Sequence, residues 1–166
     1  MVSKNSYRKI TRSLSPVFLG LIILPLLWPQ STSERLTVGQ PRKVTGKRNE
    51  AVQTRIPVSI LEGYHVNSNT PSEEYLIPLT VTWTSLGALE GGQVVFPKAS
   101  NEKYEFADKP LSVFTGNFEL AVNFKVSAKA PAGPGAASGK LRYQACSNRA
   151  CYPPKTVDIN VPYQVQ

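Results

Sequence analysis

YQACSNRACYPP, residues 143–154, contains both cysteines of this 166-residue chain, Cys146 and Cys151. A run of alternating apolar and polar residues, 139–145, leads into the stretch, and a second such run, 156–165, leads out of it. Alternation with period two is typical of a half-buried β-strand. The sequence therefore predicts two strands joined by a short, tight loop with a cysteine at each end.

The cysteine pair is open to more than one interpretation. A disulfide here would close a loop of six residues, and such a loop contributes only about 2 kcal/mol. Strained or exposed short-loop disulfides are the labile, catalytic kind, and a cation such as Arg149 favours the thiolate. Zinc would need two further ligands, but the chain has a single histidine, His65, and its one methionine is the first residue. We therefore expect no metal or other cofactor, and both a static and a redox-active disulfide remain open.

Residues 55–166 are predicted to form one all-β domain. Their short segments are rich in β-formers, are separated by glycine and proline, and show no helical period over ten or more residues. This pattern is typical of an antiparallel β-sandwich. The region 130–138 is rich in proline, glycine and alanine and is predicted to be a loop. The other expected strands cover residues 55–61, 78–84, 93–96, 111–114 and 118–126.

The N-terminal third carries the basic excess of the chain. Residues 1–13 are basic without an acid, and residues 14–28 are uncharged and mostly apolar. This order is typical of a secretory signal, and the run is short for a membrane span. Residues 1–30 are therefore expected to be either a cleaved signal peptide or an uncleaved membrane anchor, and the rest of the chain to be exported. Residues 31–54 are basic, lack an apolar period and are predicted to be a flexible linker.

The net charge of +8 does not extend into the predicted domain. From residue 56 onward, basic and acidic residues are equal in number. A nucleic-acid-binding domain usually carries a basic patch or stripe. We therefore expect no nucleic-acid partner, and contact with a membrane only through the N-terminal segment.

The two halves of the cysteine stretch, Tyr-Gln-Ala-Cys and Cys-Tyr-Pro-Pro, resemble the active-site segment of the N-terminal periplasmic domain of DsbD, the thiol:disulfide interchange protein. The resemblance runs from about Val52 to the C-terminus, although the cysteine spacing is one residue shorter than in the best-known members. It implies an immunoglobulin-like sandwich with a reversible disulfide. It further implies that Cys151 forms the intermolecular bond to a partner and that Cys146 resolves it.

The resemblance also implies which residues surround the sulfurs. A segment with Tyr64, His65 and Asn67 is expected beside the cysteine loop, with His65 tuning the thiolate fraction, although an ordinary strand-end histidine is the alternative. Phe114, followed by Gly116, resembles the aromatic cap that covers the disulfide, unless Phe114 is simply a core residue. Tyr152 and the two prolines after it are expected to hold Cys151 at the rim.

The functional expectation is an exported, periplasmic thiol–disulfide exchange domain that passes electrons between proteins. Its implied partners are thioredoxin-fold proteins and a membrane electron donor of the DsbD type. The alternative is a non-catalytic β-sandwich interaction module in which the disulfide is only structural. A reduction potential below about −300 mV is typical of a structural bond and would favour that alternative.

Overall fold

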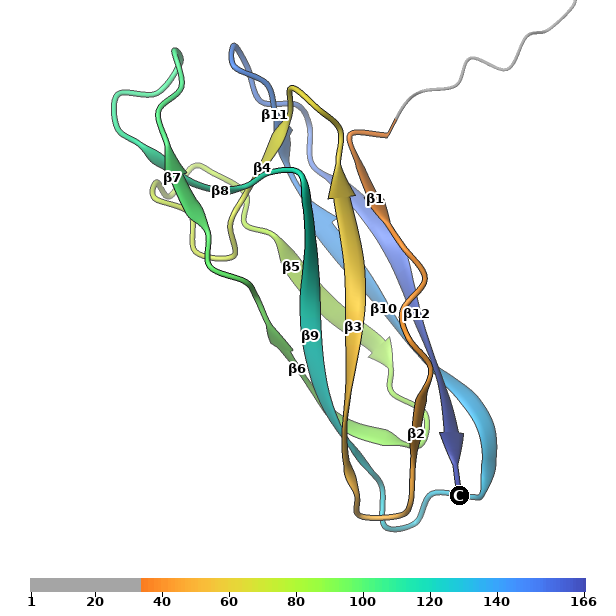
Figure 1. Cartoon of the computed structure of the whole chain (residues 1–166). Helices are drawn as coiled ribbons and strands as arrows, with labels where there is room; N and C mark the ends of the chain where they lie inside the picture. The colour runs from red at the N-terminus through yellow and green to blue at the C-terminus, as the bar shows by residue number, and fades with distance from the viewer. Residues whose placement is uncertain (1–33) are drawn as a thin grey trace, which may run out of the picture. The chain divides into compact units, whose positions relative to one another are not determined.

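The computed structural model describes residues 34–166 (Figure 1). These residues form twelve β-strands and no helix, which confirms the predicted all-β class. It follows that the described part of the chain has no helix that could cross a membrane. The expected signal or anchor, residues 1–30, lies outside the described residues.

Two four-stranded sheets form the sandwich and share one apolar core. The first has the strand order β1 (Leu36–Val38), β3 (Ala51–Ile60), β9 (Asn117–Val126) and β6 (Leu89–Val95). The second has the order β2 (Val44–Gly46), β12 (Lys155–Val165), β10 (Gly133–Tyr143) and β5 (Thr80–Ser85). All pairs are antiparallel except β2 with β12, which is parallel.

The core follows from the alternation in the sequence. Ile56 and Val58 on β3, and Leu120 and Val122 on β9, are almost fully buried, while the residues between them are more exposed. On the opposing sheet, Leu141 of β10 is buried in the same cluster. Burial of one such side chain stabilises the fold by roughly 1.5–3 kcal/mol. Because apolar residues alternate with polar ones, this gain is largest when the apolar face of each strand points inward.

A third sheet at one end of the sandwich carries the cysteine loop (Figure 1). Its order is β11 (Ala145–Cys146), β4 (His65–Asn67), β8 (Leu111–Phe114) and β7 (Ser100–Glu102). Because β11 follows β10 after one residue, the sandwich delivers Cys146 directly to the edge of this small sheet. The sheet therefore joins the cysteines to segments that are distant in sequence.

The expected linker, residues 31–54, is wrong over its described part. Residues 34–54 contain β1, β2 and the beginning of β3, and Leu36 and Val44 are buried in the core. Three-residue strands are too short to show a period, and the exposed basic residues between them hid the pattern. The domain therefore includes residues 34–54, which the sequence boundary at residue 55 had left out.

The loop predicted for residues 130–138 is also wrong in its second half, because β10 begins at Gly133. Pro134 pairs with Gln164 of β12, whereas the pairing of β10 with β5 begins only at Ser138. A proline that lacks a donor is tolerated where one side of the strand is an open edge. A Cβ at Gly135 would meet the ring of Tyr163, so this strand position needs glycine for a packing reason.

Candidate functional site

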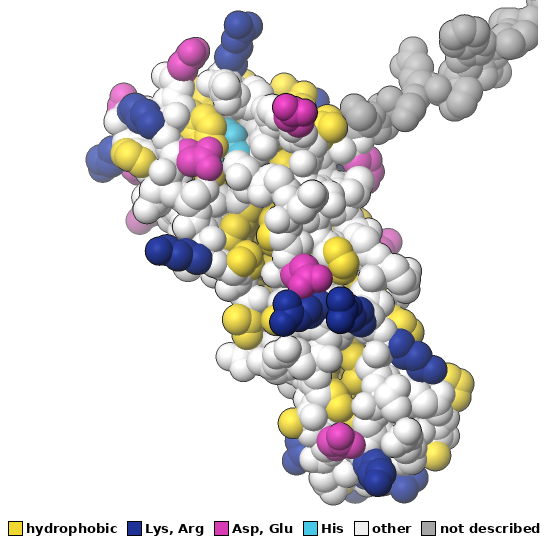
Figure 2. All heavy atoms as spheres, in the orientation of Figure 1, with side chains coloured by type: hydrophobic (Ala, Val, Ile, Leu, Met, Phe, Trp, Pro, Cys, Tyr) yellow, Lys and Arg dark blue, Asp and Glu magenta, His cyan; other side chains and the backbone are white. Residues whose placement is uncertain are grey.

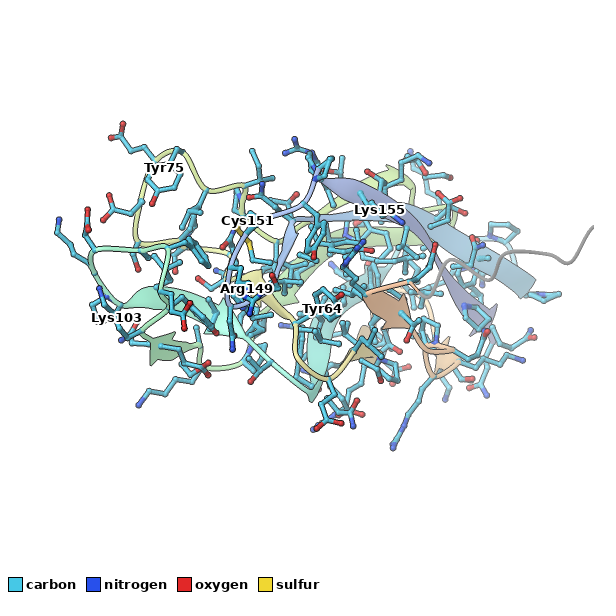
Figure 3. The ribbon with its side chains drawn as sticks, turned by 90° about the horizontal axis from the view of Figure 1, so that it is seen from above. Tyr64, Tyr75, Lys103, Arg149, Cys151 and Lys155 are labelled. Carbon is cyan, nitrogen blue, oxygen red and sulfur yellow. A yellow bond between two sulfur atoms is a disulfide. The ribbon has the colours of Figure 1, made fainter. Side chains whose placement is uncertain are left out.

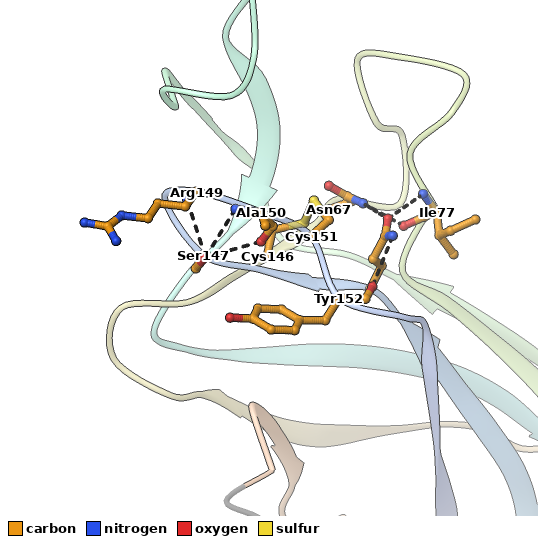
Figure 4. The surroundings of a disulfide bond; sticks show 9 residues. Asn67, Ile77, Cys146, Ser147, Arg149, Ala150, Cys151 and Tyr152 are labelled. Carbon is orange, nitrogen blue, oxygen red and sulfur yellow. Dashed lines mark hydrogen bonds between the residues drawn. A yellow bond between two sulfur atoms is a disulfide. The ribbon is translucent and has the colours of Figure 1, made fainter.

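Cys146 and Cys151 are joined by a disulfide, and their Cα atoms are 3.9 Å apart (Figure 4). Two backbone hydrogen bonds hold the loop independently of the sulfurs. The amide of Ser147 donates to the carbonyl of Ala150 at 2.8 Å, and the amide of Tyr152 donates to the carbonyl of Ala145 at 2.9 Å. The backbone therefore keeps the two cysteines close to each other before the disulfide is considered.

The two sulfurs differ in access. Cys146 belongs to β11 and is fully buried, whereas Cys151 is half-buried. Cys151 packs against a small apolar cluster at this end of the domain, hereafter the end cluster, whose buried members are Leu76, Tyr104, Ala107, Leu111 and Val113. Seen from above, Cys151 lies between the loops that carry Tyr75 and Lys103 and the side of the domain that carries Lys155 (Figure 3). A protein that approaches this end meets Cys151 before Cys146.

Gln144 ties the cysteine loop to two neighbouring segments (Figure 4). Its Oε1 accepts hydrogen bonds from Nδ2 of Asn67 at 3.1 Å and from the amide of Ile77 at 3.2 Å. Its Nε2 donates to the carbonyl of Tyr152 at 3.2 Å. This bond gives the motif Gln-Ala-Cys a physical reason, because the Gln144 side chain holds the backbone of Tyr152, the residue after the second cysteine. Asn67, expected near the cysteines, is a fully buried part of this network.

His65 lies directly opposite Cys146 in the β4–β11 pair. Directly opposite residues of an antiparallel pair are neighbours on one face of the sheet. The imidazole is 1% exposed and stacks on Tyr104, with 3.8 Å between ring centroids. Burial lowers the pKa of His65 from 6.5 to about 4, against the opposing effect of the Glu102 carboxylate. The ring is therefore neutral at neutral pH and does not supply a cation to a thiolate.

The prediction that Phe114 caps the disulfide is wrong. Phe114 is a buried residue of the main core, where its ring stacks on Phe118 at 4.9 Å and on Phe96 at 6.5 Å. It is the core residue that the sequence left open as an alternative. Phe114 of β8 lies opposite Val66 of β4, which is also buried in the main core. The phenyl ring therefore points into the core.

The aromatic residues beside Cys151 come instead from the segment between β7 and β8, residues 103–110, hereafter the lid segment. Tyr104 is buried in the end cluster, and Phe106 packs against that cluster as Cys151 does. The Tyr104 hydroxyl donates to Oε2 of Glu102 at 2.7 Å, and Nζ of Lys103 donates to the carbonyls of Ala107 and Asp108. The alternation Tyr-Glu-Phe in this segment was the sequence signal that could have indicated aromatic side chains in the cluster beside Cys151.

A cation and two tyrosines lie beside the second cysteine. The guanidinium of Arg35 lies over the ring of Tyr152, with 3.7 Å from Cζ to the centroid, and 5.2 Å from the ring of Tyr64. The two tyrosine rings are 5.9 Å apart. Arg149, by contrast, is exposed, and its side chain extends away from the disulfide (Figure 4). The cation that contacts an aromatic ring of the cysteine loop is therefore Arg35, and not Arg149 as the sequence suggested.

Two glycine turns border the site. Gly63 and Gly116 adopt positive φ angles of 81° and 60°, which glycine reaches at no steric cost. The carbonyl of Gly116 accepts a hydrogen bond from the amide of Ile60 at 2.8 Å, so the two turns are fixed to each other. Both glycines line a hollow of about 390 Å³ beside the cysteine loop. Gly116 therefore shapes the surroundings of the site, although Phe114, the cap residue that it was expected to follow, belongs to the main core.

This site has the parts of a thiol–disulfide centre. A half-buried cysteine is bonded to a buried one, and the backbone holds both. Within residues 34–166, no group of three His, Cys, Asp or Glu side chains is arranged to hold a metal ion. The fold and the site together define an immunoglobulin-like sandwich domain with a cysteine pair at one end.

Comparison with known families places the domain. The family model described as thiol:disulfide interchange protein DsbD, N-terminal, matches residues 33–162, and the chain belongs to this family. The match begins before β1, in agreement with the folded state of residues 34–54. A search among curated proteins gave no match.

Two solved structures are similar to this chain. One is the N-terminal periplasmic domain of ScsB from Proteus mirabilis, at 15% identity and a TM-score of 0.51, covering 69% of this chain. The present chain spans 42% of that structure. The other is the seventh ScaB type I cohesin from Pseudobacteroides cellulosolvens, at 15% identity and a TM-score of 0.44, covering 79% of this chain and 92% of the cohesin. At these identities, the ScsB likeness concerns the fold alone.

Proposed function

We propose that this chain is an exported thiol–disulfide exchange domain in which Cys151 bonds to partner proteins and Cys146 resolves that bond. The observation that carries the proposal is the pairing of a half-buried Cys151 with a fully buried Cys146. Thiol–disulfide exchange needs one sulfur with access and a second one placed to release the partner. Membership of the DsbD N-terminal family supports the same chemistry.

The exchange transfers two electrons in two steps. The Cys151 thiolate of the reduced domain attacks one sulfur of a partner disulfide, and the other partner sulfur leaves as a thiolate. The Cys146 thiolate then attacks the Cys151 sulfur, and the first partner sulfur leaves. The domain ends with the Cys146–Cys151 disulfide and the partner with two thiols. The reverse sequence, with a membrane electron donor of the DsbD type, would reduce the domain again.

The backbone bonds of the cysteine loop argue against a purely structural disulfide. Ser147 with Ala150, and Tyr152 with Ala145, already close the loop. A cross-link between residues that are held together adds only about 2 kcal/mol in the chain-entropy model. A structural role would gain more from a bridge across the two sheets.

The lid segment has a defined part in this proposal. Tyr104 and Phe106 lie in or against the cluster that covers one side of Cys151. Exchange rates depend on the access of the attacked sulfur, so this segment would shield the disulfide from small thiols until a partner docks. We assign the partners to thioredoxin-fold proteins and the location to the periplasm, as the family and the similarity to the N-terminal periplasmic domain of ScsB suggest.

Trapping of a mixed disulfide tests the proposal. The reduced Cys146→Ser variant, mixed with an oxidised thioredoxin-fold protein, should accumulate a complex on non-reducing electrophoresis, because the Cys151 bond cannot resolve. The Cys151→Ser variant is the matched control and should accumulate none. Equal trapping by both variants would refute the division of roles. If neither folded variant traps any of several such proteins, the disulfide is structural and the domain is an interaction module.

A further inference from the structure

A hollow of about 390 Å³ lies directly beside the cysteine loop. Its walls come from the turn at residues 60–65, the turn at residues 115–117 and the beginning of the lid segment. Asn148, between the two cysteines in sequence, completes the wall. A partner whose cysteine reaches Cys151 therefore has this hollow next to its own contact surface.

The hollow is acidic. Glu62 and Glu102 line it, and none of its lining residues is a lysine or arginine. Hydrogen bonds from Tyr104 and Ser100 hold the pKa of Glu102 below its usual value, so this carboxylate is ionised at neutral pH. Lys103, its sequence neighbour, turns its ammonium to backbone carbonyls of the lid segment. Acidic and apolar side chains gather around the single histidine at the upper end of the face in Figure 2.

The wall of the hollow also holds an unused hydrogen-bonding atom. His65 lines the hollow, is 1% exposed, and its Nε2 has no hydrogen-bond partner among the described residues. A buried polar atom without a partner costs roughly 1–3 kcal/mol. The ring of Tyr104 stacks on this imidazole and bonds to Glu102 through its hydroxyl. The wall of the hollow thus contains a polar atom without a hydrogen-bond partner, on a ring that Tyr104 of the lid segment covers on one face.

We propose that this hollow seats a basic side chain, lysine or arginine, which the partner protein carries close to its redox cysteine. The inference rests on the proposed exchange function and names a feature of the partner. Neither Glu62 nor Glu102 forms an ion pair within residues 34–166, so their carboxylates are available to attract a positive charge into the hollow. Asn148 of the cysteine loop lines the hollow, so a side chain bound there would lie next to the loop that carries Cys151.

One hydrogen bond links the acidic hollow to the lid segment. Oε2 of Glu102 accepts the Tyr104 hydroxyl at 2.7 Å. A guanidinium or ammonium that pairs with this carboxylate competes with the tyrosine for the same oxygen. Occupation of the hollow therefore weakens the hold on Tyr104, which belongs to the cluster beside Cys151. A partner of the right charge would thereby uncover Cys151, the sulfur with which it is about to exchange.

Short cysteine peptides, capped as mixed disulfides with thionitrobenzoate, provide the test. The reduced domain attacks the peptide sulfur and releases the coloured thiolate, so the rate is read directly. The peptides form three matched series with arginine, glutamine or glutamate at varied distances from the cysteine. At low ionic strength the best arginine peptide should react roughly fivefold faster than its glutamate counterpart, the size expected of a partly exposed ion pair. Added salt should reduce this ratio.

Variants of the two acids locate the effect. Glu102→Gln keeps an oxygen for the Tyr104 hydroxyl but loses the charge, and it should lower the arginine-to-glutamate ratio; Glu62→Gln should act in the same direction. Glu90→Gln removes an equal charge opposite Lys125, at the far end of β9 from the hollow, and should leave the ratio as it was.

The outcomes separate the two proposals. Equal rates for all three series would overturn the proposal that the hollow binds a basic side chain, and so would an arginine-to-glutamate rate ratio that Glu62→Gln and Glu102→Gln leave unchanged. Either result would leave the exchange function standing. If no peptide reacts with the folded, reduced domain, the exchange function itself fails. A salt-sensitive preference for arginine in the wild-type protein supports the seat even if a variant does not fold.

Discussion

The guanidinium of Arg35 lies over the ring of Tyr152, with 3.7 Å between Cζ and the ring centroid. Arg35 immediately precedes β1, and Tyr152 immediately follows Cys151. The carbonyl of Arg35 also accepts a hydrogen bond from the amide of Leu61, at the turn that borders the hollow. The beginning of the domain therefore supports both sides of the candidate site.

Substitution of Arg35 should loosen the cysteine loop. A cation over an aromatic ring contributes about 0.5–1 kcal/mol at exposed positions and up to about 2 when desolvated. We expect Arg35→Ala to lower the free energy of unfolding in urea by about 1 kcal/mol and to speed alkylation of reduced Cys151. Lys43→Ala, which removes an exposed charge from the same region, is the control. Equal effects of the two changes would contradict a specific contact between Arg35 and Tyr152.

Removal of the lid aromatic should expose the disulfide. We expect Phe106→Ala to speed reduction of the Cys146–Cys151 bond by dithiothreitol roughly two- to tenfold, since one aromatic contact contributes about 0.5–1.5 kcal/mol. The measurement is the loss of disulfide with time under native conditions. Phe96→Ala deletes another half-buried phenyl ring, in the main core, and should not speed reduction in the folded protein. An unchanged rate of disulfide reduction in Phe106→Ala would show that Phe106 does not shield the disulfide.

Truncation of Phe114 should act on stability rather than on access. Phe114 is 4% exposed and stacks on Phe118. We expect Phe114→Ala to cost about 3–5 kcal/mol of unfolding free energy, as is usual for a buried phenylalanine. Phe114→Leu should cost much less, because it keeps most of the buried volume. Faster reduction of the disulfide in a Phe114→Ala protein of wild-type stability would restore Phe114 as the cap.

Buried His65 should make stability depend on pH. Burial lowers the pKa of His65 from 6.5 to about 4 in the folded state. As pH falls through 6.5, the unfolded chain takes up this proton before the folded one does, so stability declines between about pH 6.5 and pH 4. Below the folded pKa both states are protonated, and this contribution does not decline further.

The His65→Phe variant isolates the contribution of the histidine, because it retains a flat ring against Tyr104 and cannot titrate. Urea unfolding at a series of pH values should show a loss of up to about 1.4 kcal/mol per pH unit in the wild type that is missing from the variant. Because His65 is the only histidine, other groups contribute little in the upper part of the window. Parallel pH profiles of the two proteins would show that His65 does not titrate as its burial predicts.

The sequence by itself determined the strand class and the centre of the site. Alternation over residues 111–114 and 118–126 corresponds to β8 and to nearly all of β9. The two cysteines are close in the chain, so local geometry was enough to predict their loop. Period-two alternation is informative because burial of one face is the main force on a strand, and it acts along a continuous stretch of residues.

Only the tertiary structure decided what surrounds the sulfurs. Arg35 lies in a segment with no period, and its contact with Tyr152 spans most of the domain in sequence. Phe114 ends the short strand β8, and Phe106 lies after the short strand β7. The pairing of β8 with β4 places Phe114 in the main core, whereas Phe106 packs against the end cluster. Such contacts depend on which strands become neighbours, a choice made by the packing of distant surfaces, and no local pattern of residues records it.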